Sequence, residues 1–131
     1  MKETKEATMQ SLSIIPRILL GLIFVVFGLN GFFHFLKVPA VPVSAQNYLS
    51  CLFSAPYFLY LVKGSEVFFG FLLLWGRWIG FALVGLAPIV INIFLFHFFL
   101  DPDGVQVGGV ILGVWGILFA TNWSRVSCLF N

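Results

Sequence analysis

The chain has 131 residues, of which 60% are hydrophobic, 18% aromatic and only 9% charged, and its formal net charge is +2. A soluble domain carries about 25% charged residues to cover its surface, so this composition excludes soluble enzymes and disordered linkers. The small net charge gives no reason to expect a nucleic acid as a partner. We therefore expect an all-α integral membrane protein whose environment is the lipid bilayer.

The N-terminal part of the chain predicts a polar tail followed by a first membrane span. Residues 1–13 are mostly polar, and residues 14–36 are mainly apolar apart from Pro16, Arg17, Asn30 and His34. A helix of this length is long enough to cross the hydrocarbon core with some tilt. It exceeds the apolar core of a secretory signal peptide, about 7–15 residues, so we expect it to remain as a span.

The longest connection, residues 37–56, contains three prolines and a short amphipathic pattern. Apolar side chains in this connection recur at helical spacing, on the face opposite Gln46, Asn47 and Ser50. This pattern favours a short interfacial helix between spans one and two. The apolar positions are Ala45, Tyr48, Leu49, Leu52 and Phe53.

Three further spans are predicted at residues 57–75, 78–100 and 105–121. A Gly76-Arg77 turn joins the first two, and the segment from Asp101 to Gly104 is a strong turn signal. With the span at 14–36, they make one domain over residues 1–131, a bundle of four transmembrane helices without strands.

Basic residues predict the orientation of this bundle. Both tails lie on one side of an even number of spans, and that side holds five of the seven basic residues, which favours cytoplasmic tails by the positive-inside rule. Trp75, Trp78 and Trp123 near that side, and Tyr57 and Tyr60 near the other, fit aromatic belts at the two interfaces. The five residues are Lys2, Lys5, Arg17, Arg77 and Arg125, against Lys37 and Lys63.

Small residues form a stripe on the first and fourth predicted helices. Gly21 and Gly28 share a face of the first helix with Arg17, and the fourth helix carries Gln106, Gly109, Gly113 and Gly116 on one face. Such stripes let helix backbones approach closely in lipid. We interpret them as packing surfaces within the bundle or between copies, in preference to a substrate path.

Six of the polar residues in the predicted spans fall in the outer half of the membrane or near its midplane. Ionisable residues in a span are costly, and they mark candidate functional sites. The sequence offers these six residues as candidate ligand-binding residues, with Glu66 and His97 foremost. They are Asn30, His34, Lys63, Glu66, Asn92 and His97.

A structural role competes with ligand binding at each of these positions. Glu66 could anchor a polar ligand group or carry a proton, or it could form a structural pair with Lys63 or His97. Asn92 and His97 lie about 140° apart on an ideal helix, so they converge on one centre only if the helix bends, for example near Pro88. Several phenylalanines could supply an apolar lining, although packing against lipid explains most of them. They are Phe32, Phe33, Phe35, Phe94, Phe96, Phe98 and Phe99.

Metal, haem and thiol chemistry find little support in the sequence. His34 and His97 at matching depth could ligate a b-type haem, but two residues are a weak signal. No cluster of metal-ligand type appears, so no metal is predicted. Cys51 and Cys128 lie a membrane apart in the predicted topology, which excludes an intramolecular dithiol relay. We assign no catalytic residue.

Several motifs together resemble the DoxX family of small bacterial membrane proteins. They are the run from Arg17 to Gly21, the segment Gly28-Leu-Asn30-Gly31, Glu66 with Gly70, and "PIVINIFLFHFFLDPDG" from Pro88 to Gly104. The resemblance covers nearly the whole chain. It implies a four-helix bundle in the bacterial cytoplasmic membrane, and the wider family includes subunits linked to thiosulfate:quinone oxidoreduction.

The leading hypothesis is a redox- or quinone-linked membrane subunit that binds an amphipathic ligand in the outer half of the bundle. Its expected partners are the bilayer together with subunits of a membrane redox complex or further copies of itself. Two alternatives stay open. One is a non-catalytic scaffold of a larger complex, and the other is a small proton-coupled exporter that depends on Glu66.

Overall fold

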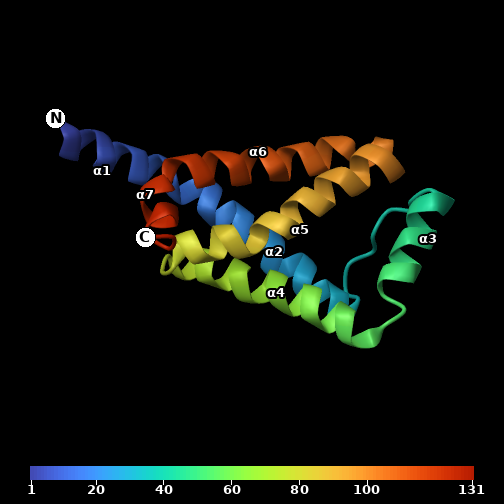
Figure 1. Ribbon diagram of the computed structural model, residues 1–131. Coiled ribbons are helices and arrows are strands. Elements are labelled where there is room, and N and C mark those ends of the chain that lie inside the picture. Colours follow the sequence, from blue (N-terminus) through green and yellow to red (C-terminus); the bar gives the residue numbers. More distant parts are fainter.

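The computed structural model describes all 131 residues as helices and connecting turns, without strands (Figure 1). Four helices are long and apolar enough to cross a membrane. They are α2 (Ile14–Phe33), α4 (Pro56–Trp75), α5 (Ile79–Leu100) and α6 (Val105–Thr121). The prediction of an all-helical chain with four long apolar helices is confirmed.

Helix α5 is the centre of the bundle. It packs against both α4 and α6, while α2 packs mainly against α4 (Figure 1). The hydrophobic core consists of 11 buried residues, and α5 contributes Ile79, Ala82, Leu83, Leu86 and Val90. Because α5 has neighbours on several sides, it contributes more buried residues to this core than any other helix, although part of its apolar surface stays exposed.

Helix α2 ends at Phe33, three residues earlier than the sequence predicts. His34 adopts a left-handed conformation with φ of 50°, which stops the helix. The backbone N–H of Leu36 then donates a hydrogen bond to Asn30 Oδ1 at 2.7 Å. The prediction that the first helix includes His34 and continues to residue 36 is therefore wrong, because His34 lies outside the helix.

The contact between α2 and α4 depends on glycine. A Cβ atom placed on Gly21 would lie 2.9 Å from the carbonyl oxygen of Gly70, and one placed on Gly70 would lie 2.9 Å from that of Gly21. Gly28 similarly lies against Val67. The glycines of α2 therefore serve packing within the bundle, as the sequence favours.

The glycine stripe of α6 behaves differently. No atom lies within 4 Å of a Cβ placed on Gly109, Gly113 or Gly116. These glycines therefore lie on a face of α6 that no other helix of this chain covers. Packing within the chain does not explain them.

The two ends of the bundle differ. At one end, α1 (Lys2–Leu12) projects beyond the bundle without a buried residue, and α7 (Trp123–Ser127) packs Val126 beside Gly80 (Figure 1). The predicted polar tail is thus helical, because the helical backbone continues through Ser13 into α2.

The opposite end carries α3 (Val43–Leu52), while the short 3-10 helix η1 (Pro102–Gly104) joins α5 to α6. Cys51 in α3 and Cys128 after α7 are free and lie at opposite ends (Figure 1), so they cannot pair within the chain.

Candidate ligand-binding cavity

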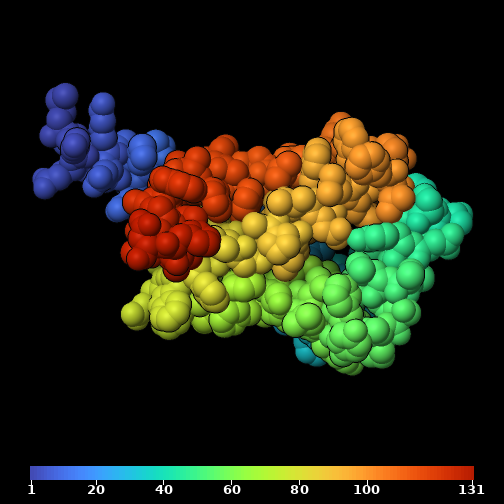
Figure 2. Space-filling model, viewed as in Figure 1, coloured from blue at the N-terminus to red at the C-terminus, as the bar shows by residue number.

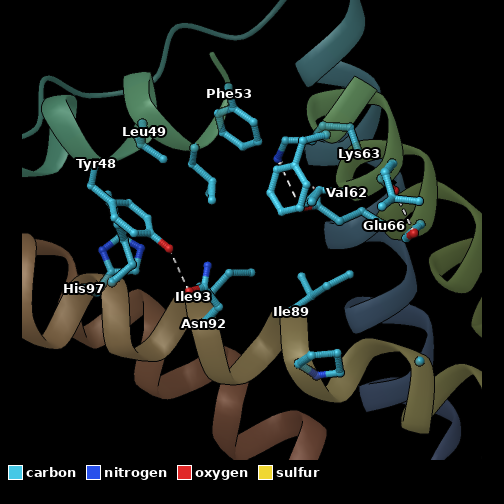
Figure 3. A pocket seen from close by; sticks show the side chains of 17 residues that line it. Tyr48, Leu49, Phe53, Val62, Lys63, Glu66, Ile89, Asn92, Ile93 and His97 are labelled. Carbon is cyan, nitrogen blue, oxygen red and sulfur yellow. Dashed lines mark hydrogen bonds and ion pairs between the residues drawn. The ribbon is translucent and has the colours of Figure 1, made fainter. Parts of the chain in front are cut away.

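Helices α3, α4 and α5 line a cavity of about 530 Å³ that is open at the surface. The surface is hollowed where these three helices meet (Figure 2), and α3 lies across the cavity from α5 (Figure 3). Most of the lining is apolar and comes from Leu49, Leu52, Phe53, Phe58, Leu61, Val62, Ile89, Ile93 and Phe96. The polar lining residues are Tyr48, Lys63, Ser65, Glu66, Asn92 and His97.

Glu66 is paired with Lys63 on the preceding turn of α4. The Lys63 ammonium donates hydrogen bonds to both carboxylate oxygens, at 3.2 and 3.0 Å. The carboxylate is almost fully buried, whereas the Lys63 side chain is 22% exposed. Because the stem of Lys63 also packs against Gly31 of α2, the pair borders the cavity on the side where α4 meets α2.

Tyr48 joins α3 to α5. Its hydroxyl donates a hydrogen bond to Asn92 Oδ1 at 3.0 Å (Figure 3), and its ring packs against Phe96. This bond leaves the amide hydrogens of Asn92 free to donate and the hydroxyl oxygen of Tyr48 free to accept. Both are hydrogen-bonding groups that a ligand in the cavity could use.

His97 is oriented by Asp101, one turn further along α5. The distance from His97 Nδ1 to Asp101 Oδ2 is 2.9 Å, and Asp101 is buried. Because a carboxylate only accepts, Nδ1 donates its hydrogen, and Nε2 has no partner within the protein. Gly104 lies close against both side chains, where a larger residue would displace them.

The structure brings four of the six candidate residues to this cavity. Lys63, Glu66, Asn92 and His97 line it, whereas Asn30 and His34 do not. Asn92 and His97 border one cavity without meeting at one centre, because Asn92 bonds to Tyr48 and His97 to Asp101. A role of these residues in binding a ligand stays a prediction.

Of the phenylalanines considered as a lining, most lie elsewhere, as packing against lipid requires. Among the seven phenylalanines named from the sequence, only Phe96 lines the cavity, while Phe33, Phe35, Phe98 and Phe99 are exposed. The residues that take their place are Phe53, Phe58 and the aliphatic side chains of α3, α4 and α5.

The side chain of Asn30 instead holds the chain that follows α2, through its hydrogen bond with the Leu36 amide, and this role is testable. We expect Asn30→Ala to lower the free energy of unfolding by about 1–2 kcal/mol, because the amide of Leu36 loses its buried acceptor. Unfolding by SDS in mixed micelles measures this loss. The control His34→Ala alters an exposed side chain and should change stability by less than about 0.5 kcal/mol. Equal effects of the two variants would contradict this role of Asn30.

Sequence reasoning missed Tyr48 and Asp101 as site residues. The spacing of four between His97 and Asp101 puts both on one face of a helix and could have indicated the pair. The contact between Tyr48 and Asn92 joins residues 44 positions apart, and no local pattern predicts it.

The arrangement can hold a molecule that has both an apolar body and polar groups. The apolar lining accepts the body, and the free hydrogen-bonding groups of Tyr48, Asn92 and His97 reach its polar atoms. No group of three or more His, Cys, Asp or Glu residues gathers in the structure as a metal site would require.

No family model matches the chain, and no curated protein or solved structure is detectably similar to it. The resemblance to the DoxX family therefore stays a prediction that rests on its motifs.

Proposed function

We propose that the chain is a multi-pass protein of the bacterial cytoplasmic membrane with both termini in the cytoplasm. The outer faces of the four long helices support insertion, because each exposes large apolar side chains, such as Leu22, Phe71, Leu95 and Val110. Contact of such side chains with lipid costs no free energy, whereas their contact with water is unfavourable. The excess of basic residues on the side of the termini supports the orientation.

Within that membrane the protein binds a small amphipathic molecule in the cavity between α3, α4 and α5. One observation carries this proposal: an apolar cavity of about 530 Å³ contains several separate polar groups that are held in place by partners. Cavities of about 300–1,000 Å³ with a few placed polar groups are typical of small-molecule sites. Polar groups are costly in a membrane interior, so those that occur there are candidates for a function.

A quinone fits this cavity chemically. Its carbonyl oxygens can accept hydrogen bonds from the Asn92 amide or the Lys63 ammonium, and its reduced form can donate a hydroxyl hydrogen to His97 Nε2. Its ring and tail match the aliphatic and aromatic lining. The chain would then be a redox-linked membrane subunit, which agrees with the resemblance to the DoxX family.

Filling the cavity should abolish ligand retention. We expect Ile93→Trp, on the cavity wall, to lower the lipophile that copurifies with the protein by at least about tenfold, because the indole occupies the space of the ligand. Glu66→Gln should also weaken retention, because it breaks the Lys63 pair that borders the cavity. Mass spectrometry of an organic extract from the gently purified protein measures both effects.

The matched control is Ile91→Trp, on the same helix but on an exposed position outside the cavity. It should retain the wild-type amount of ligand. Gel filtration confirms that each variant is folded before extraction. If wild type and all variants contain the same bulk phospholipid and nothing else, the ligand-binding proposal is wrong.

A scaffold for a larger membrane complex is the second candidate function. The observation that favours it is the uncovered glycine face of α6, formed by Gly109, Gly113 and Gly116. Copurification of a stoichiometric partner with an empty cavity would support it. A proton-coupled exporter is less favoured, because the required carboxylate, Glu66, is already engaged by Lys63.

A further inference from the structure

The guanidinium of Arg17, in the first turns of α2, lies against the turn between α4 and α5. This turn comprises residues 76–78, and Gly76 begins it with φ of 75°. A Cβ atom on Gly76 would lie 2.5 Å from Arg17 Nη1, 3.2 Å from Cζ and 3.3 Å from Nη2. The similar distances to Cζ and Nη2 show that the guanidinium lies closely over the glycine. Glycine is therefore required here both for its conformation and for the space that Arg17 occupies.

Arg17 has no partner in the protein. Its guanidinium makes no hydrogen bond or ion pair, and its Nε is the one buried side-chain nitrogen or oxygen without a hydrogen-bond partner. A buried donor of this kind costs free energy unless something outside the chain accepts its hydrogen. Arg17 is only half-buried, so a ligand can reach its outer edge.

A second guanidinium flanks the same turn. Arg77 follows Gly76 directly, is exposed, and lies over the Trp75 ring at 5.3 Å from the ring centroid. No carboxylate neutralises either arginine. Glu66 and Asp101 are paired with Lys63 and His97 towards the other end of the bundle. The other carboxylates are Glu3 and Glu6, on the projecting α1, and Asp103, in η1.

The surroundings place these two arginines at the depth of lipid headgroups. Trp75 directly precedes the turn and Trp78 ends it, and their side chains are 58% and 69% exposed. Exposed tryptophans concentrate where the hydrocarbon core meets the headgroups. The turn lies at the end of the bundle that carries both termini (Figure 1).

We propose that Arg17 and Arg77 form a binding site for the phosphate of an anionic phospholipid at the turn between α4 and α5. A guanidinium presents paired donors that match two phosphate oxygens, so Arg17 gains acceptors that the protein does not provide. The site is separate from the cavity and depends on the proposed function only through insertion into a membrane. A dissolved phosphate ion has the same chemistry, and the experiment separates the two sources.

The test is a native mass spectrometry titration of the detergent-solubilised full-length protein with phosphatidylglycerol, and in parallel with phosphatidylcholine of the same chain length. Wild type should bind phosphatidylglycerol in preference to phosphatidylcholine. Arg17→Gln and Arg77→Gln should each lower phosphatidylglycerol binding by roughly fivefold, the factor expected for one basic contact near the headgroups. Arg17→Lys should retain part of the binding, because it keeps the charge but loses the paired donors.

The matched control is Arg125→Gln. It removes one positive charge from the same end of the bundle, but Arg125 Nη1 is bonded to Asn122 Oδ1. It should change binding by less than about twofold. Arg77 is exposed on the surface, so Arg77→Gln keeps the test decisive even if Arg17→Gln does not fold.

Two results would overturn the proposal. One is equal loss of phosphatidylglycerol binding in Arg125→Gln and in the two turn variants, which would indicate a general charge effect. The other is full displacement of the lipid by millimolar inorganic phosphate, which would identify dissolved phosphate as the ligand. Copurification of the cavity ligand is a separate measurement, so failure here leaves the proposed function untouched.

Discussion

Lys63→Met should destabilise the protein by about 3–5 kcal/mol, the loss expected when one partner of a buried ion pair is removed. Glu66 is 5% exposed, and Lys63 is its only hydrogen-bonding partner. Methionine keeps most of the stem that packs against Gly31, so the change mainly removes the charge. The remaining carboxylate is then buried without compensation. Unfolding of the detergent-solubilised protein by SDS measures the effect.

The double variant Lys63→Met with Glu66→Leu is the decisive control. It removes both charges and keeps similar volumes, so it should recover most of the lost stability. A double-mutant cycle that also includes Glu66→Leu alone gives the coupling energy between the two residues. If Lys63→Met is as stable as wild type, the pair does not hold the carboxylate as we describe.

Gly70→Leu should be the second most damaging change, with a loss of about 3 kcal/mol or more. Its Cβ would lie 2.9 Å from the carbonyl oxygen of Gly21 and 3.0 Å from the backbone nitrogen of Val25. Backbone atoms of a packed helix cannot give way as a flexible side chain can, so α2 and α4 would have to separate. Thermal unfolding monitored by circular dichroism measures the effect.

Gly113→Leu is the matched control for this change. It makes the same substitution within a long apolar helix, but nothing lies within 4 Å of a Cβ at Gly113. The isolated chain should keep its stability or gain some, because glycine costs about 0.5–1 kcal/mol within a helix. A loss comparable to that of Gly70→Leu would mean that the uncovered face of α6 is packed in the native protein.

The sequence predicts the long helices well because their signal is strong and local. The fourth span was predicted at 105–121 and α6 is Val105–Thr121, since the Asp101 to Gly104 turn marks its start clearly. Helix α2 is the exception, because nothing in the apolar run indicates that His34 becomes left-handed. Beyond this stop, the Asn30 side chain accepts a hydrogen bond from the Leu36 amide, a contact that the hydrophobic pattern does not indicate.

The candidate site was predicted less completely, and the reason differs from residue to residue. Glu66 and Lys63 are three positions apart on one helix, so their pairing follows from helical geometry. Asn92 was identified because an amide is rare in an apolar span, but its partner Tyr48 lies on α3. Only the fold of the 37–56 connection back over α5 brings them together.

By itself, therefore, the sequence determines an all-helical chain with four long apolar helices, and it indicates which polar residues interrupt them. These properties follow from the composition and from the spacing of residues along one helix. Both are local features of the sequence and do not depend on how the helices pack. The tertiary structure alone decides that α3 covers a cavity, that Tyr48 meets Asn92, and that Arg17 reaches the turn at Gly76. Tyr48 and Arg17 contact residues distant in the chain, and which distant residues meet depends on how whole helices pack.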